Sequence, residues 1–246
     1  MGLRLNVGCG SKKKAGCIGI DYIQGPEVDF VLDVTRERWP FEDESVEYVY
    51  SSHTFEHLDS PNHVLEEIGR VCCDGATIEI WTPYAFGNHA FLYGHTAFLT
   101  EEIWLNFCYT YRDMHRDLLK GQWLLKNINY VVLPQVQHEL ERHGFSLDFA
   151  IKYFRAVVFE FGVDIEFRKA DAAPLLPQRT YSHTRDGERF PLPPCDMHLY
   201  DPAQPQTFGY IVKKFSVLYL VKKLWRRLLK RYFPIVTPCK PQTSRR

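Results

Sequence analysis

The sequence begins with a short apolar run that leads directly into two glycines, LRLNVGCG at residues 3–10. Four similar runs follow, each bounded by Gly, Pro, Asp or Ser, at residues 17–21, 28–32, 46–50 and 76–82. None alternates cleanly between polar and apolar residues, which is typical of strands buried on both faces of a parallel sheet. This pattern predicts an α/β fold that binds its ligand beyond the carboxyl ends of the strands.

Helical patterns lie between and after these runs. Residues 61–71 place their apolar side chains on one helical face, with Ser60 available as the N-cap and Gly75 as a stop before the next strand. The remaining predicted elements are a helix over 133–143 and strands over 146–154 and 158–169. The order predicts a Rossmann-like, doubly wound α/β sheet.

The chain changes character along its length. We predict four parts, which are the α/β domain over 1–170 with an aromatic lid or insertion at 84–130, a Pro-rich linker or ordered wrap over 171–207, a basic amphipathic helix over 208–233, and a basic tail over 234–246. Residues 202–246 contain eleven basic and no acidic residues, although the whole chain has a formal net charge of zero. The acidic body and basic end predict an anionic partner for the end alone.

Cysteine usage and hydropathy indicate a reducing compartment. The seven cysteines are odd in number and form no C-x-x-C pair, which argues against a disulfide scaffold or a zinc cluster. We find no secretory signal and no apolar stretch long enough to span a membrane. The expected location is the cytoplasm, with peripheral attachment to the inner face of the membrane.

The glycine loop favours an adenosine ligand that carries no phosphates. A dinucleotide fingerprint needs a third glycine and a full helix before the acidic residue, and here Asp21 comes too soon. Asp21 ends the second predicted strand, where a carboxylate can accept both ribose hydroxyls, and Asp33 follows the third strand beside the place of the adenine. These carboxylates favour a cationic ligand, and the missing third glycine disfavours a nicotinamide dehydrogenase.

At this point the sequence resembles a known family. The motifs LNVGCG, GIDY, VLDV, WPFEDESVEYVYSSHTFEHL and VLEEIGRVCCDGATIEIWTPY resemble, in order and spacing, the class I S-adenosylmethionine-dependent methyltransferases, in their small-molecule, type 11-like branch. The resemblance implies a mostly parallel sheet with a final antiparallel strand and S-adenosyl-L-methionine as cofactor. The short segment between the first two strands departs from the family, and it suggests that the first helix is reduced or missing.

The resemblance also implies a set of cofactor-binding residues. They are Gly8, Cys9 and Gly10 beside the methionine part, Asp21 and Tyr22 at the ribose, Asp33 and Val34 at the adenine, and Ser51 and Ser52 on the sulfonium side. Asn6 stands where many members have an acidic residue, and we expect it to hydrogen-bond the glycine loop.

Histidines are the natural candidates for a base that removes the proton of an acceptor hydroxyl. We predict His53, His57 and His89 as catalytic candidates, because they follow the ends of predicted strands. Each has an alternative structural role, and His95 is a further candidate for substrate contact. We considered His53, His57, His89 and His95 as metal ligands and predict no metal site, because His53 and His57 share a face only if their segment is helical.

Residues 216–233 place basic pairs on one half of a helix and apolar pairs on the other. This pattern is typical of a helix that lies on an anionic membrane surface, and docking on a partner subunit or on its own domain stays open. Nucleic acid is disfavoured, because no base-reading module accompanies the charge.

The resulting hypothesis is a methyltransferase that O-methylates a sugar of a glycan or lipid-linked saccharide in polysaccharide biosynthesis, with a histidine base. A phenolic or other small-metabolite acceptor, and a non-catalytic cofactor-binding scaffold at a membrane, are the alternatives.

Overall fold

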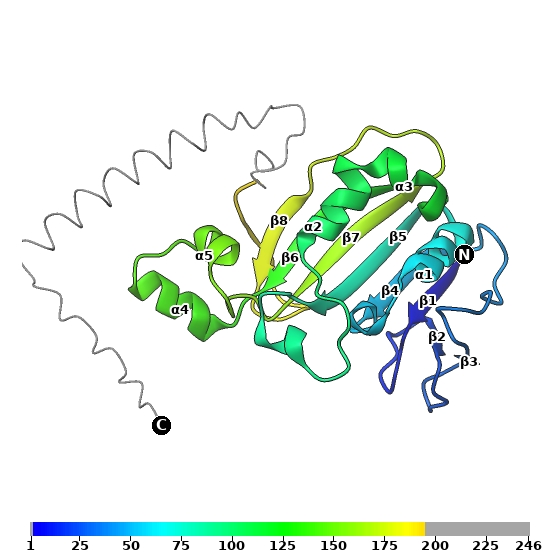
Figure 1. The fold of residues 1–246 in the computed structure, drawn as a ribbon, viewed down its shortest axis with the longest axis horizontal. Coiled ribbons are helices and arrows are strands. Elements are labelled where there is room, and N and C mark those ends of the chain that lie inside the picture. Colours follow the sequence, from blue (N-terminus) through cyan, green and yellow to red (C-terminus); the bar gives the residue numbers. More distant parts are fainter. Residues whose placement is uncertain (1, 195–246) are drawn as a thin grey trace, which may run out of the picture. The chain divides into compact units, whose positions relative to one another are not determined.

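The computed structural model describes residues 2–194 (Figure 1). The basic amphipathic helix and basic tail predicted over 208–246 lie outside the described residues.

The centre of the fold is a nine-stranded sheet in the order β3-β2-β1-β4-β5-β7-β6-β8-β9. Its strands are β1 (Leu3–Val7), β2 (Ile18–Asp21), β3 (Phe30–Val31), β4 (Val46–Ser52), β5 (Cys72–Pro83), β6 (Gln122–Val131), β7 (Glu160–Arg168), β8 (Gln178–Ser182) and β9 (Phe190–Pro191). The strands β1 to β5 pair in parallel, whereas β7 runs antiparallel to both β5 and β6. The predicted Rossmann-like sheet with an antiparallel strand is therefore confirmed.

The strand order reverses between β1 and β4. The chain moves outward from β1 through β2 to β3, and then crosses back to place β4 on the other side of β1. In open α/β sheets, ligands bind beyond the carboxyl ends of the strands at such a reversal. The ends of β1, β2, β3 and β4 thus define where a site is expected.

The helices flank this sheet. They are α1 (Asn62–Val71), α2 (Glu101–Leu105), α3 (Arg112–Leu119), α4 (Pro134–Arg142) and α5 (Leu147–Tyr153), with the short turns η1 (Phe55–His57), η2 (Asn88–Phe91) and η3 (Asn106–Thr110). Figure 1 shows α1, α2 and α3 in front of the sheet, and α4 and α5 beyond the end of β6. The core beneath them includes fully buried Leu5, Val49 and Ile78.

The helix predicted over 61–71 is present, but its ends differ from the prediction. Pro61 is the N-cap and no side chain caps the helix, so Ser60 does not have the predicted role. The strand β5 begins at Cys72, directly after the helix, and Gly75 lies inside it at a φ of 82°. Gly75 is therefore part of an irregular start of the strand, where the pairing with β4 shifts register, and not a stop before it.

The strand predicted over 146–154 is wrong, because these residues form helix α5. The hydroxyl of Ser146 accepts a hydrogen bond from the N–H of Phe149 at 3.3 Å and caps the helix. Arg179 of β8 donates to Asp148 at 2.6 Å and holds the helix against the sheet edge. A local cap and a distant ion pair thus outweigh the β-like composition.

Three strands of the sheet come from two regions that we predicted to lie outside the sheet. The strand β6 lies mostly within the aromatic insertion predicted at 84–130, and it pairs with β7 over its whole length. The strands β8 and β9 lie within the predicted linker or wrap and extend the sheet edge past β6. Among residues 2–194 there is no helix long and apolar enough to cross a membrane.

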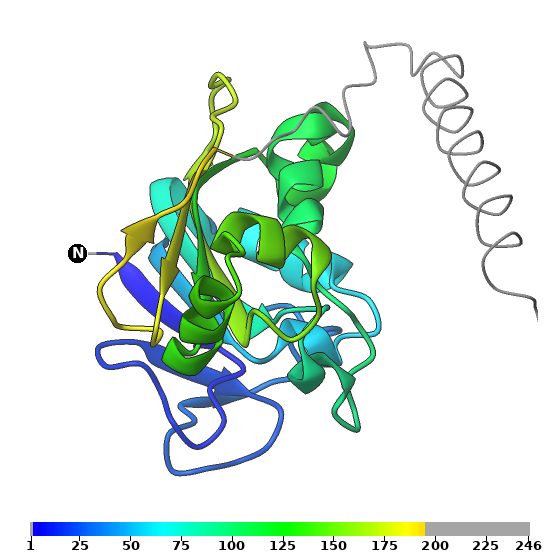
Figure 2. The ribbon, with the colours of Figure 1, turned by 90° about the vertical axis from the view of Figure 1, so that its left-hand side faces the viewer.

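Residues 8–17 between β1 and β2 form turns without a helix, as their short length predicts. This loop covers the tyrosines of β4, because Lys14 Nζ lies 4.1 Å from the ring centroid of Tyr50 and 2.7 Å from Glu79. Figure 2 shows the loops of this first part, in blue, gathered at one end of the sheet. Side chains and loops thus replace the missing helix.

Candidate active site

A cleft of about 950 Å³ opens at the carboxyl ends of β1, β2, β3 and β4. Its volume is within the range of small-molecule and cofactor sites. It is lined by Asn6, Gly8, Cys9, Gly10, Ser11, Lys12, Asp21, Tyr22, Asp33, Val34, Thr35, Tyr50, Ser52, His53, Thr54, His57, Leu58, Gly94 and Arg185. Eight of the nine predicted cofactor-binding residues are in this group, and only Ser51 is not.

The glycine loop after β1 has a backbone that requires glycine. Gly8 and Gly10 have φ values of 66° and 52°, in the left-handed region. A Cβ on Gly8 would lie 2.0 Å from Thr54 Oγ1, whereas one on Gly10 would meet nothing within 4 Å. Gly8 thus allows a close approach between two loops, and Gly10 leaves space free in the cleft.

Asp21 joins this loop to the end of β2. Its Oδ2 accepts a hydrogen bond from the N–H of Gly10 at 2.8 Å, and its Oδ1 accepts one from Ile23 at 3.1 Å. Asn6 holds the other side of the loop, since its Oδ1 accepts the N–H of Lys14 at 2.8 Å. The carboxylate is therefore fixed at the wall of the cleft, as a group that binds ribose hydroxyls must be.

Asp33 follows β3 and turns back on its own loop. The hydroxyl of Thr35 donates to Asp33 Oδ1 at 2.6 Å and the Thr35 N–H donates at 3.0 Å. These hydrogen bonds lower the pKa of Asp33 below its ordinary value, although its side chain is only partly buried. Asp33 therefore stays ionised beside Val34 in the cleft.

Cys9 and Ser51, which were also predicted to bind the cofactor, are both buried. Cys9 is buried, and burial, with the charge of Asp21, raises the pKa of its thiol to about 11, so it is no nucleophile at neutral pH. Ser51 is fully buried, and its hydroxyl donates to the carbonyl of Val7 at 3.1 Å. Ser52 lines the cleft, because successive strand residues point to opposite faces.

His53 lines the cleft with both ring nitrogens engaged by carboxylates. Nδ1 lies 3.0 Å from Glu56 Oε1 and Nε2 lies 2.9 Å from Glu160 Oε2. The hydrogen bonds to Glu160 and then Glu56 raise the pKa of His53 to about 9. The Arg185 guanidinium also lies 3.0 Å from Nε2. With both ring nitrogens engaged and a raised pKa, His53 is poorly suited to act as a general base.

Arg185 also lines the cleft, and no sequence motif predicted it as a site residue. It comes from the loop between β8 and β9 and donates to Glu160 Oε2, to Ser52 Oγ at 2.7 Å and to Tyr50 Oη at 2.9 Å. Burial alone would raise the pKa of Glu160, but the bonds from His53 and Arg185 hold it below its ordinary value. Arg185 reaches the side chains of β4 because β8, which it follows in the chain, pairs with β6 in the sheet.

The other predicted catalytic histidines separate into two places. His57 lines the cleft, and its Nδ1 lies 2.9 Å from the carbonyl of Gly94, which leaves Nε2 as the acceptor nitrogen. His89 is outside the cleft, with its ring centroid 4.2 Å from that of Phe159. The structure thus brings His57 to the cofactor cleft and His89 to a packing contact.

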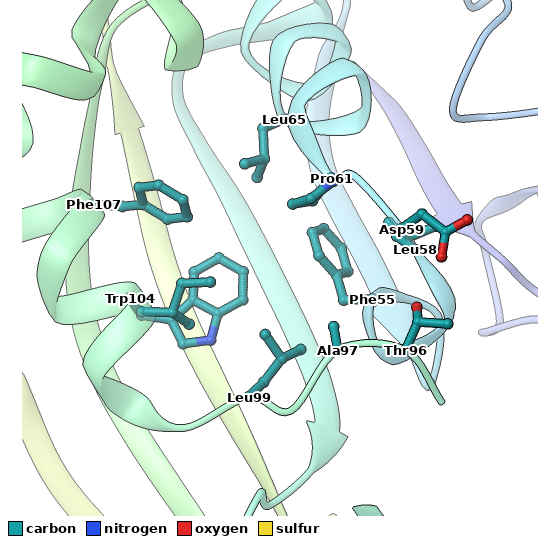
Figure 3. Close-up of a pocket in the computed structure, with 11 residues that line it drawn as sticks. Phe55, Leu58, Asp59, Pro61, Leu65, Thr96, Ala97, Leu99, Trp104 and Phe107 are labelled. Carbon is teal, nitrogen blue, oxygen red and sulfur yellow. The ribbon is translucent and has the colours of Figure 1, made fainter. Parts of the chain in front are cut away.

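A second, smaller pocket of about 210 Å³ adjoins the cleft, because Leu58 lines both. Figure 3 shows Phe55, Trp104 and Phe107 pointing into it from η1, α2 and η3. Apart from Asp59 and Thr96, its lining side chains are apolar. An apolar group next to a ligand in the cleft would fit there.

Comparison with known proteins relates this arrangement to one family. Residues 5–80 match the family model of a methyltransferase domain, and this segment contains the end of β1, the strands β2 to β4, the glycine loop and both cleft aspartates. No curated protein matches the chain.

Several solved structures are similar at low identity. A SAM-dependent methyltransferase from Archaeoglobus fulgidus is 15% identical, with a TM-score of 0.48 and 67% of this chain and 86% of that chain covered. A putative methyltransferase from Bacillus halodurans is 15% identical, with a TM-score of 0.42 and coverage of 68% and 93%. A putative methyltransferase from Haloferax volcanii, in complex with the Trm112 activator, is 15% identical, with a TM-score of 0.43 and coverage of 69% and 83%. These likenesses are distant and add no argument about the acceptor.

The site itself fits the cofactor of this family. Gly10 leaves room in the cleft, Asp21 is held at its wall by the N–H of Gly10, and the two cleft carboxylates suit a cationic sulfonium. Residues 5–80 are thus similar to a methyltransferase domain, and the strand order and the glycine loop of the structure agree with that similarity.

Proposed function

We propose that the chain methylates a hydroxyl of a sugar, in a glycan or a lipid-linked saccharide of polysaccharide biosynthesis. The observation that carries this proposal is the chemistry of one group of residues that line the cleft. Polar groups of Tyr50, Ser52 and Arg185 meet in this group. Gly94 also lines the cleft, and the segment around it carries exposed aromatic rings at Phe91, Tyr93 and Phe98. Polar groups beside exposed aromatic faces suit a sugar, which has both hydroxyls and apolar ring faces.

The proposed cofactor position follows the predicted residues. Gly8 and Gly10 would pack beside the methionine part, Asp21 would accept the ribose hydroxyls, and Asp33 with Val34 would border the adenine. S-adenosyl-L-methionine supplies an electrophilic methyl group on a sulfonium, so the protein has to align the acceptor and exclude water.

His57 is the predicted base that this geometry favours. Its Nδ1–H is held by the Gly94 carbonyl, and its Nε2 lone pair is free to act on an acceptor hydroxyl. His53 lacks a free nitrogen, and its raised pKa keeps it protonated. We therefore assign His53 to fixing Glu56 and Glu160, and His57 to the activation of the hydroxyl.

The basic pattern at 216–233 supports a membrane-bound acceptor. Eight Lys and Arg residues follow Val212 up to Arg231, and they are interleaved with Leu, Trp and Tyr. Replacement of Lys222, Lys223, Arg226 and Arg227 by Glu should abolish binding to anionic vesicles in a flotation assay. Unchanged flotation would remove the membrane from the proposal and leave the methyl transfer intact.

A phenolic or other small acceptor is the second candidate, and the apolar pocket favours it. Phe55, Trp104 and Phe107 would enclose an aromatic ring whose hydroxyl reaches the cleft at Leu58.

A transfer assay with methyl-labelled S-adenosylmethionine separates these candidates. We expect label in sugar acceptors and a loss of kcat of about 10²-fold or more in His57→Gln, because general-base catalysis contributes that much. His143→Gln, at the exposed end of α4, is the matched control and should keep full activity. Transfer to phenols alone would favour the second candidate, and a loss confined to His89→Gln would contradict the assignment of His57.

A further inference from the structure

A cluster of metal-ligating groups lies at the rim of the cleft. Glu56, His57 and His95 each offer one ligand atom, and these atoms all lie within 4.8 Å of one another. The ring centroids of His57 and His95 lie 4.7 Å apart, and the two rings meet edge to face. Ligands of one tetrahedral zinc ion lie about 3.3 Å apart, so side-chain adjustments without a change of fold would close the set.

Both histidines are held in the orientation typical of metal ligands. His57 Nδ1 lies 2.9 Å from the Gly94 carbonyl, and His95 Nδ1 lies 3.2 Å from the Ala90 carbonyl. A carbonyl partner requires a proton on Nδ1, so the lone pair of each ring is on Nε2. A second-shell carbonyl on the other ring nitrogen is the usual companion of a metal-bound histidine.

The buried carboxylate of Glu56 is a second, independent observation that points to a bound ion. Its side chain is 2% exposed, its Oε1 is bonded to His53, and its Oε2 is buried without a hydrogen bond to any described residue. A buried carboxylate oxygen without a partner is costly, and native structures rarely keep one. A cation at Oε2 would remove this cost.

The backbone fixes the two segments of the cluster together. The N–H groups of Thr96 and Ala97 both donate to the backbone carbonyl of Glu56, at 2.8 and 3.1 Å. The chain that carries His95 is therefore anchored on the residue that supplies the carboxylate. Two distant parts of the sequence thus hold the three ligand side chains close together. The binding of an ion would therefore cost little conformational entropy.

We propose that Glu56, His57 and His95 bind one divalent transition-metal ion, such as Zn²⁺, at the rim of the cofactor cleft. Two imidazoles and one carboxylate favour Zn²⁺ over Mg²⁺ or Ca²⁺, which prefer sets of oxygen ligands. Three protein ligands also leave a fourth position open, as in catalytic zinc sites.

The open coordination position adds a detail to the proposed function, because an acceptor hydroxyl could bind the ion there. This catalytic use rests on the proposed function, whereas the binding of the ion does not. A bound ion lowers the pKa of an acceptor hydroxyl, whose proton then passes to solvent. His57 would then act on the acceptor through the ion and not as a free base. The binding of the ion itself requires neither cofactor nor acceptor, so it can fail or succeed separately.

The test is a titration of the chelator-treated full chain with Co²⁺, followed by competition with Zn²⁺. We expect one Co²⁺ per chain, visible absorption bands of a four- or five-coordinate ion, and displacement by Zn²⁺. His95→Gln should weaken Co²⁺ binding more than tenfold and remove these bands. His143→Gln should change neither, because His143 with Glu139 on α4 is an exposed His/Glu pair of the kind that binds metals adventitiously.

Three results would overturn the proposal. They are no Co²⁺ binding to the wild-type chain, equal binding in His95→Gln, and a thiolate-to-metal charge-transfer band, which would place the ion on a cysteine. Calorimetry with S-adenosylmethionine on the same metal-free sample shows separately whether the cofactor cleft is intact.

Discussion

The two ends of the cleft are built in different ways. The end proposed for the cofactor, called the cofactor end, comes from turns that directly follow β1, β2 and β3, so its groups lie close together in the sequence. The end proposed for the acceptor, called the acceptor end, combines His53 and His57 with Gly94, Glu160 and Arg185, which belong to four separate segments. The first end depends on backbone conformation, and the second depends on ion pairs between side chains from distant elements. Mutations at the two ends should therefore change stability and cofactor affinity in different ways.

Gly8→Ala should have the largest effect. The added Cβ would collide with Thr54 and the residue would keep a left-handed φ of 66°, so we expect a loss of about 3 kcal/mol in the free energy of unfolding. Urea denaturation measures this loss. Gly10→Ala meets open space and should lose only about 1–2 kcal/mol, while S-adenosylmethionine binding weakens because the Cβ enters the cleft. Equal losses of stability in the two variants would contradict the role assigned to Thr54.

Arg185→Gln tests the acceptor end. Among residues 2–194 it leaves Glu160, whose side chain is 8% exposed, with only His53 as a charged partner, so we expect about 2–3 kcal/mol of destabilisation. Cofactor affinity should fall less than in Asp21→Ala, because the hydrogen bonds of Arg185 go to Glu160, Ser52 and Tyr50 and not to the two cleft aspartates. A double variant with Glu160→Gln should recover part of the stability, and a failure to recover it would show that the pair is not coupled.

Asp21→Ala tests the cofactor end without a large change in the fold. It removes charged hydrogen bonds to the proposed ribose position, and affinity for S-adenosylmethionine should fall by about 1–3 kcal/mol in calorimetry. Asp29→Ala is the comparison, because Asp29 pairs with Lys13 outside the cleft and should leave affinity unchanged. Unchanged affinity in Asp21→Ala would mean that the ribose lies elsewhere.

The smallest effect concerns pH. The pKa of His53 is raised from 6.5 to about 9, so its ion pairs contribute fully below pH 6.5 and their contribution is lost as pH rises towards about 9. The difference in melting temperature between wild type and His53→Gln should therefore shrink over this interval. A difference that is constant from pH 6 to pH 9 would show that His53 is not held as a cation.

The same division explains what the sequence could predict. Residues 3–83 have strands and turns whose patterns are local. The sequence predicted β1 to β5 and α1, and eight of the nine residues predicted to bind the cofactor line the cleft. Ser51 was not separated from Ser52, because the face that a strand residue occupies depends on register with β1. The helix at 147–153 was missed, because its cap and its partner Arg179 outweigh a β-like composition.

The acceptor end could not be predicted in this way. Arg185 lies in a segment that the sequence predicts as a linker, and its contact with Ser52 exists only because β8 pairs with β6. The approach of His95 to Glu56 likewise depends on two backbone hydrogen bonds between loops. Sequence patterns report the local periodicity of one element, and they contain no information about such contacts.

The most direct test of the account is calorimetric titration of the full chain with S-adenosylmethionine, S-adenosylhomocysteine and NAD. The account predicts that both adenosyl ligands bind with one site per chain, that Gly10→Ala and Asp21→Ala weaken them, and that NAD does not bind. Binding of NAD, or adenosyl binding that neither variant weakens, would contradict the assignment of the cleft.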